Sequence, residues 1–220
     1  MSALRLDPSA LPLNEKLVLA PQFRGANGNG VFSIARASGQ TIISCHAQLG
    51  MLLFRNALNF EAKSIWNTEA GELQDFQEIN HKSGMIRDSA RGLAAAKSKF
   101  ESELILDPLS ALYALRQNPL RKEGDLRVGY CARGENPVVV EIFARGSKDK
   151  AVKAFGSAPR RLLKLELLIE SPKYDRKVPV FQDGRTGLWI DLETNIPVEV
   201  SYEIPPIGAL SMALESIDQR

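Results

Sequence analysis

The two histidines and two cysteines of the chain are the residues best suited to bind a metal or to act as nucleophiles. His46 directly follows Cys45, whereas His81 and Cys131 stand alone. Neighbouring residues of a strand point to opposite faces of a sheet, so Cys45 and His46 make a poor chelating pair. Neither cysteine lies at the start of a predicted helix, where its pKa would be lowered. We predict no metal site and two buried thiols, with a disulfide between them as the alternative in an oxidising compartment.

Three carboxylates are the candidates for hydrolytic chemistry. Asp191 and Glu193 share one face of a predicted strand, and two carboxylates held a few ångströms apart can hydrolyse a glycosidic bond. Asp107 is the third acid, although its place before a helix favours capping. The sequence contains no G-x-S-x-G segment, so it lacks the nucleophile elbow of one large hydrolase class. We predict a protein with no catalytic residues and no cofactor, and we keep a hydrolase as an alternative.

Residues 25–30, Gly-Ala-Asn-Gly-Asn-Gly, look like a phosphate-binding loop only in composition. The spacing is not G-x-G-x-x-G, and no Lys-Ser or Lys-Thr pair follows. Because Asn and Gly tolerate positive φ angles, these residues predict a tight turn.

The charge balance argues against a polyanionic partner. Of the 220 residues, 44% are hydrophobic and 25% are charged, as is usual for a globular protein, and 28 basic residues nearly cancel 26 acidic ones. The net charge of +2 gives no support to nucleic-acid binding. No apolar run reaches the roughly 18 to 20 residues of a bilayer-spanning helix, so membrane contact would be peripheral at most. The first sixteen residues contain no apolar block of a secretory signal, which leaves a cytoplasmic location open.

Strands dominate the predicted secondary structure. Apolar or β-branched residues, several with period-two alternation, predict about ten strands over residues 16–23, 31–37, 41–49, 58–67, 71–79, 125–132, 138–144, 161–170, 187–192 and 196–203. Strands follow strands without a regular βαβ rhythm, which favours an antiparallel sheet. We predict a mainly β protein, with a flexible lead-in over residues 1–15 and a single β-rich domain over residues 16–215.

One helix is clearly signalled. Asp107 is a favoured N-cap, and Pro108 suits the first helical position, where its missing N–H is not needed. Leu109, Leu112 and Tyr113 then fall on one helical face, which predicts a helix over residues 108–117. Residues 81–100 predict only a marginal helix or a polar excursion between strands.

Two segments together resemble a bacterial family known only as domain of unknown function DUF3108. They are Asp107-Pro-Leu-Ser-Ala-Leu-Tyr-Ala-Leu-Arg116 and Gly187-Leu-Trp-Ile-Asp-Leu-Glu-Thr-Asn-Ile-Pro-Val198, the latter followed by Ile207-Gly-Ala-Leu210. The resemblance extends over residues 58–214 and implies an exported protein of the periplasm or cell envelope. That family in turn resembles the carriers and receptors of bacterial lipoproteins, whose curved antiparallel half-barrels hold an acyl chain on a concave side closed by helices.

This resemblance implies a single curved antiparallel sheet or half-barrel with one or two short helices covering it. Our first hypothesis is a non-catalytic envelope protein that binds a lipid-like ligand or a lipoprotein partner, with Leu109, Leu112, Tyr113, Trp66 and Trp189 as candidate ligand-binding residues. Large aromatics on sheets are usually core residues, which is the alternative for both tryptophans. A structural or interaction module of the envelope is the second hypothesis. A hydrolase of an envelope polymer is the third. The oligomeric state is not predicted.

Overall fold

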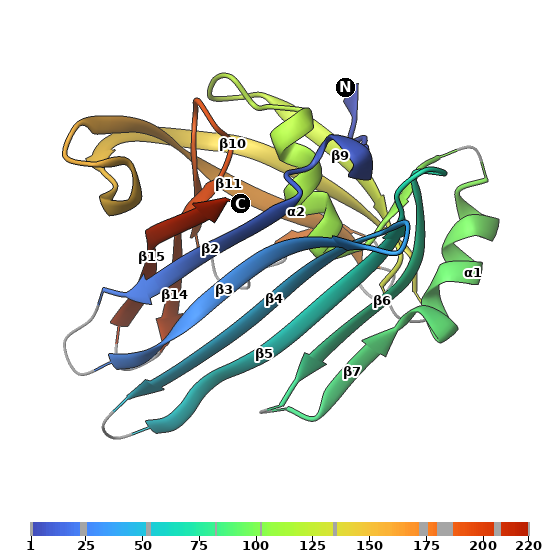
Figure 1. Ribbon diagram of the computed structural model, residues 1–220, viewed down its shortest axis with the longest axis horizontal. Coiled ribbons are helices and arrows are strands. Elements are labelled where there is room, and N and C mark those ends of the chain that lie inside the picture. The colour runs from blue at the N-terminus through green and yellow to red at the C-terminus, as the bar shows by residue number, and fades with distance from the viewer. Residues whose placement is uncertain are drawn as a thin grey trace.

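The chain folds into one large curved sheet with two α-helices (Figure 1). This computed structural model describes residues 2–22, 26–51, 54–81, 83–101, 103–133, 136–171, 176–179, 187–204 and 208–219. The strands are β1 (Ser2–Ala3), β2 (Asn14–Pro21), β3 (Ala26–Ala37), β4 (Gln40–Met51), β5 (Phe54–Asn67), β6 (Glu72–Asn80), β7 (Met85–Asp88), β8 (Ile105–Leu106), β9 (Leu126–Cys131), β10 (Val138–Ala151), β11 (Pro159–Ser171), β12 (Arg176–Pro179), β13 (Gly187–Asp191), β14 (Pro197–Ile204) and β15 (Gly208–Gln219). The helices are α1 (Ser89–Lys99) and α2 (Pro108–Gln117), and η1 (Pro8–Ala10) and η2 (Lys153–Phe155) are 3₁₀ turns.

The sheet is open and almost wholly antiparallel. Its strand order is β1-β9-β10-β11-β13-β14-β15-β2-β3-β4-β5-β6-β7, with β8 paired to β9 and β12 paired to β11. Only the short strands β1 and β8 run parallel to their neighbour, β9. The predicted antiparallel half-barrel is therefore confirmed. The described residues form more strands than the ten expected, because strands of two to four residues are too short to show alternation, and serines and Glu215 interrupt the apolar pattern of β15.

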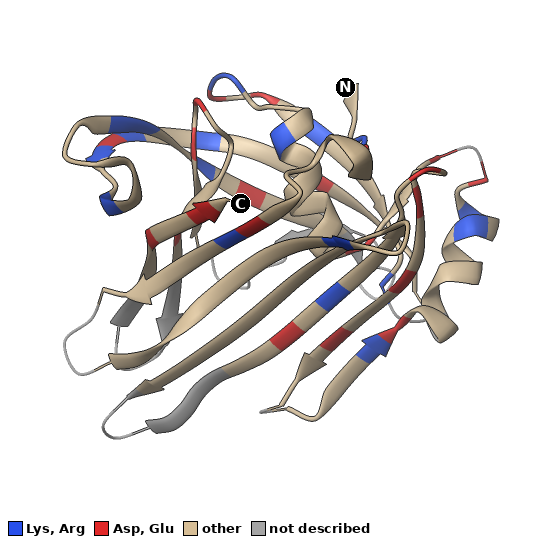
Figure 2. Cartoon of the chain, viewed as in Figure 1, with Lys and Arg blue, Asp and Glu red and all other residues tan. Residues whose placement is uncertain are grey.

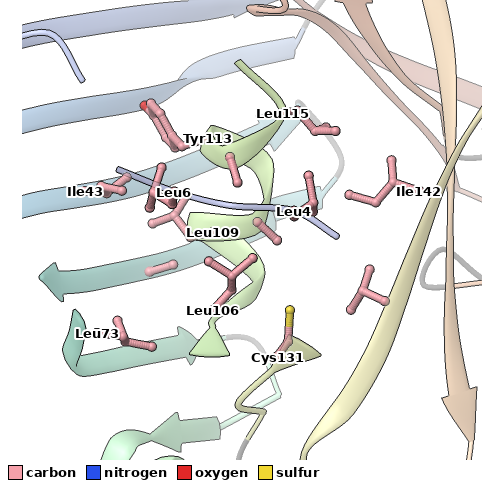
Figure 3. Packing of buried hydrophobic residues seen from close by; sticks show 14 of the residues in the cluster. Leu4, Leu6, Ile43, Leu73, Leu106, Leu109, Tyr113, Leu115, Cys131 and Ile142 are labelled. Atoms are coloured by element: carbon pink, nitrogen blue, oxygen red, sulfur yellow. The ribbon is translucent and has the colours of Figure 1, made fainter. Parts of the chain in front are cut away.

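The sheet curls so that two walls face each other, with α2 between them on the concave side (Figure 1). One wall consists of β2 to β6 and the other of β9 to β11. The main core joins both walls to α2: Figure 3 shows Leu109 and Leu115 of the helix together with Ile43 of one wall and Ile142 of the other. The predicted bounds of this helix, residues 108–117, are confirmed.

Residues 81–100, for which the sequence predicts only a marginal helix or an excursion, form the edge strand β7 and the helix α1. The C-terminal end of α1 reaches toward β9. The Phe100 and Tyr130 rings lie 5.1 Å apart, and the Lys99 ammonium donates to the Pro137 carbonyl at 3.1 Å. The helix therefore lies between the two ends of the open sheet.

The first residues of the chain, predicted as a flexible lead-in, contribute to the main core instead. Leu4, Leu6 and Leu11 are buried in it. The guanidinium of Arg36 donates to three backbone carbonyls at and after η1, those of Pro8, Ser9 and Leu11. Three isolated leucines among polar residues and prolines show no periodicity, which is why the sequence did not reveal this role.

The expected tight turn over residues 25–30 is wrong for the described part, because residues 26–30 belong to β3. Gly28 has a φ of +117°, and a Cβ atom built there would lie 2.1 Å from the carbonyl oxygen of Gln48 on the adjacent β4. Glycine is therefore needed at this position for both its conformation and its close contact. The hairpin turn that joins β3 to β4 lies at Ser38 and Gly39, and both residues have positive φ.

Replacing Gly28 by alanine tests this close approach. We expect Gly28→Ala to lower the free energy of unfolding by about 1–3 kcal/mol, because the new Cβ meets backbone and the positive φ is strained. Gly146→Ala is the matched control, since nothing lies within 4 Å of a Cβ there, and it should change stability by less than about 0.5 kcal/mol. Urea unfolding followed by circular dichroism measures both, and equal effects would contradict the strained approach.

Candidate functional site

A set of partly exposed apolar side chains borders the main core on the concave side. They come from β3, β5, α2, β11 and β14, and all pack against the buried core: Phe32, Phe60, Leu112, Leu167, Ile169 and Val200. The strand registers place them on the core-facing side, since Phe32 pairs with Cys45 and Val200 with Leu188, both core residues. We call these six residues the concave apolar surface.

A buried polar network fixes the N-terminal end of α2. Asp107 is only 2% exposed, and its Oδ1 accepts from the backbone N–H of Leu109 at 2.9 Å and of Ser110 at 3.2 Å. The Ser64 hydroxyl of β5 donates to the same oxygen at 2.8 Å, and the Ser110 hydroxyl donates to Oδ2. Trp66 donates from Nε1 to the Ser110 hydroxyl at 2.8 Å. The carboxylate therefore caps the helix and also attaches it to the sheet.

Burial raises the pKa of Asp107, against the opposing effect of its hydrogen bonds from Ser110 and Ser64. The network is fully enclosed by protein atoms, so this acid is a structural group.

A buried ion pair fixes the C-terminal half of α2. Arg116 lies 2.5 Å from the Glu15 carboxylate of β2, whose side chain is completely buried. Gln219 of β15 donates to the other Glu15 oxygen at 2.7 Å. The first and last long strands of the chain thus meet the helix at one carboxylate. Removing either charge would leave the other buried without its partner, which is costly.

Tyr113 lies between this ion pair and the sheet. It is 3% exposed, and its hydroxyl has no hydrogen-bond partner within the described residues. Figure 3 shows the ring extending from α2 over the sheet on the side of Ile43. Burial is the main cause that raises the pKa of this phenol, and the Glu15 carboxylate adds to it.

The structure brings four of the five predicted ligand-binding residues together. Leu109, Tyr113 and Trp66 are buried in the main core, and the partly exposed Leu112 packs against it. Trp189 lies apart, against a second core formed by β2, β11, β14 and β15, with the Lys148 ammonium 3.9 Å from its ring centre. Whether any of them contacts a ligand stays a prediction.

The two histidines share one carboxylate, since Glu61 lies 3.9 Å from His46 and 3.3 Å from His81, whereas the two thiols lie in the core. Cys45 and Cys131 are free and buried. Burial raises the pKa of Cys45 to about 12 and that of Cys131 further, so neither is a thiolate nucleophile at neutral pH. Across the part of the chain that the structure describes, no three His, Cys, Asp or Glu side chains form a metal-binding group.

Two of the three acids considered for hydrolysis lie together, and the third lies apart. Asp191 and Glu193 both bind the guanidinium of Arg160, at 2.7 and 2.9 Å. Burial raises the pKa of Asp191, but hydrogen bonds from Arg160 and Thr194 outweigh it and hold the pKa below its usual value. Asp107 belongs to the separate network under α2. These contacts give each of the three acids a structural role.

The basic residues of the β10–β11 hairpin are largely neutralised. Figure 2 shows Lys and Arg gathered there. Lys148 and Lys150 bind Glu199, Lys153 binds Glu215, Arg161 binds Asp149, and Arg145 binds Glu166. A cavity of about 260 Å³ beside the hairpin is lined by apolar residues such as Leu162 and Val198 and by the paired charges of Lys150, Lys153, Glu199 and Glu215. Pairing removes the excess positive charge that a polyanion would need.

Several residues of this region were not found by sequence analysis. Period-two alternation within residues 161–170 puts Leu167 and Ile169 on the same face as the core residues Leu163 and Leu165, but nothing local indicates that Phe32 and Val200 are partly exposed. Ser64 lies on the same face of its strand as Trp66, but no local pattern indicates its hydrogen bond to Asp107.

No family model matches the chain, and no curated protein matches it. One similar solved structure is a beta-barrel-like protein of domain of unknown function DUF1849 from Brucella abortus, with 11% identity, a TM-score of 0.47, and coverage of 99% of this chain and 100% of that one. Another is described as a "putative exported protein" with a YmcC-like fold from Bacteroides fragilis, with 10% identity, a TM-score of 0.34 and full coverage of both chains. The resemblance to DUF3108 has no family model behind it. Likenesses this distant support no argument about activity.

The Asp107 network should make a large contribution to stability. We expect Asp107→Ala to lower the free energy of unfolding by about 2–4 kcal/mol, because it removes the cap and leaves the hydroxyls of Ser64 and Ser110 with one partner fewer. Asp7→Ala is the control, since Asp7 caps only the exposed turn η1, and it should cost less than about 1 kcal/mol. Urea unfolding measures both, and a small effect at Asp107 would contradict the network.

The same carboxyl should show a pH signature. An acid whose pKa is raised by folding binds more protons in the folded state, so stability falls as pH rises from about 4, the unfolded value, through the folded pKa. Asp107→Asn lacks this titration and imitates the protonated acid. The stability of the wild type relative to Asp107→Asn should therefore decrease between pH 4 and pH 7, as measured by urea unfolding at several pH values. A pH-independent difference would exclude a raised pKa.

Proposed function

We propose that the protein is a non-catalytic binding protein that holds an apolar, lipid-like ligand against the concave apolar surface. The proposal rests on six apolar side chains of the sheet and α2 that are partly exposed. All six pack against the main core. Apolar area in contact with water costs roughly 25 cal/mol per Å², so a ligand that covers it gains affinity. Apolar surfaces gathered in a concave region are the usual setting of small-molecule sites.

The paired acids and buried thiols support a non-catalytic role. Asp107, Asp191 and Glu193 bind neighbouring side chains or backbone. Cys45 and Cys131 face the protein interior. A hydrolase would need such groups to converge on a substrate, whereas Asp191 and Glu193 converge on Arg160, and Asp107 caps α2.

We also propose a location in the periplasm or cell envelope. This part rests on the sequence resemblance of residues 107–116 and 187–198 to an exported family, and a lipoprotein's acyl chain is then a natural ligand. The helices of the described residues are too short and too polar to cross a membrane. Fractionation of cells that produce the full-length natural protein would test the location.

A role as an interaction module is the second candidate. It is favoured by Ile86, which is 58% exposed on the terminal strand β7 of the open sheet. An exposed edge strand can pair with an extended segment of another protein. The two candidates use different surfaces, so one pair of variants can separate them.

Titration with diphenylhexatriene, an apolar probe that fluoresces when it leaves water, tests ligand binding. We expect saturable binding. We expect Leu112→Ser to weaken it about fivefold, because the substitution removes part of the concave apolar surface.

Leu13→Ser is the matched control. Leu13 is 60% exposed and is not part of either core, so this variant should bind the probe as the wild type does. Circular dichroism would confirm that both variants are folded. Absence of saturable binding, or equal effects of the two leucine substitutions, would overturn the proposal. Weakening by Ile86→Ser instead would place the apolar contact at the sheet edge.

A further inference from the structure

The Tyr113 hydroxyl is a buried hydrogen-bond group without a partner in the described residues. Such groups are rare, because a phenol that gives up its water loses a hydrogen bond unless protein, water or ligand replaces it. The neighbouring polar groups do not serve it: the Arg116 guanidinium is engaged with Glu15, which also accepts from Gln219. The Tyr113 O–H is therefore a hydrogen-bond donor without an acceptor, and the neighbouring Arg116 and Glu15 are already paired with each other.

The Tyr113 hydroxyl ends a ring that extends from α2 over the sheet on the side of Ile43 (Figure 3). Its electrostatic neighbours are Glu15, Arg116 and Cys45. Cys45 is buried in the main core, and Phe32, the residue opposite it on β3, is partly exposed and belongs to the concave apolar surface. Leu112, which directly precedes Tyr113 on α2, also belongs to the concave apolar surface. Tyr113 thus stands at the boundary between the solid core and the proposed binding surface.

We propose that Tyr113 is the polar anchor of the ligand site, and that the ligand is a single-chain amphiphile with an uncharged oxygen acceptor, such as the ester carbonyl that joins an acyl chain to its headgroup. The inference rests on the proposed function. The acyl chain lies along Phe32, Leu112 and Val200, and the carbonyl accepts the Tyr113 hydrogen bond. The side chains that enclose the hydroxyl in the ligand-free protein move as the ligand enters.

The head is uncharged because of the adjacent ion pair. Arg116 and Glu15 already neutralise each other, so a ligand carboxylate placed there would be a buried charge with no free counter-ion. An ester or amide carbonyl needs only the one donor that Tyr113 offers. Because a neutral hydrogen bond is involved, its loss should change affinity by about fivefold.

Three fluorescent probes that share a chain separate these effects: decylpyrene, which has no head, the methyl ester of pyrenedecanoic acid, and the free acid. Each is titrated at pH 7.5 into wild type and Tyr113→Phe. Tyr113→Phe keeps the ring and removes only the unpartnered oxygen, so the thermal unfolding temperature should not fall. Tyr130→Phe, on a partly exposed tyrosine of β9, is the matched control and should change none of the affinities.

We expect Tyr113→Phe to weaken binding of the ester about fivefold and to leave decylpyrene unchanged, with the acid weaker than the ester on the wild type. If decylpyrene and the ester lose affinity equally, or neither loses any, the anchor is overturned while ligand binding at the concave apolar surface stands; a buried water on Tyr113 would give this second result. If the acid binds more tightly than the ester and Tyr113→Phe removes that advantage, the uncharged head is overturned. If no probe binds, the proposed function fails and the anchor fails with it.

Discussion

The seating of α2 in the concave side of the sheet is the constraint on which the structure depends. A helix in this position must bury polar groups at both ends, and each end has its own solution. The Asp107 carboxylate accepts hydrogen bonds from the first backbone N–H groups of the helix and from the Ser64 hydroxyl of β5. Arg116, about two and a half turns further along the helix, forms an ion pair with the buried Glu15 of β2. Because burying a charge is costly unless it is paired and hydrogen-bonded, these contacts specify one seating of the helix far more narrowly than apolar packing could.

That seating divides the concave side into two parts. Where α2 lies, side chains from both walls and the helix form a solid core that includes Leu109, Leu115 and Ile142. Beyond α2, the strands continue with the same alternation. Neither of the two helices in the described part of the chain covers this region, so Phe32, Phe60 and Leu167 stay partly exposed. The concave apolar surface therefore exists because the strands extend further than the part of the concave side that α2 covers. A sheet built only for stability would gain by ending its apolar alternation where the helix ends.

The sequence predicted the parts that depend on local patterns. The helix over residues 108–117 follows from one cap, one proline and a 3.6-residue spacing, and the core-facing sides of β5 and β11 follow from period-two alternation. It could not predict contacts between distant residues. Glu15 and Arg116 are 101 positions apart, and Arg36 binds carbonyls that any residue could supply. Gly28 was mistaken for a turn because a positive φ is common to turns and to close strand contacts, and only the neighbouring Gln48 backbone distinguishes them.

The candidate site also depends on a long-range pairing that no local signal reveals. Phe32 and Phe60 come from the wall that begins at β2, whereas Leu167, Ile169 and Val200 come from the chain's second half. The two halves of the sheet are joined where β15 pairs with β2, with Gln219 opposite Glu15. Closing a loop of some two hundred residues carries a large entropic cost before any contact compensates it, so this pairing is expected to form late in folding. Glu15 accepts from both Gln219 and Arg116, so the residue that closes the sheet is also the one that holds the helix. The concave apolar surface is thus assembled only in the completely folded chain, because its residues come from both halves of the chain.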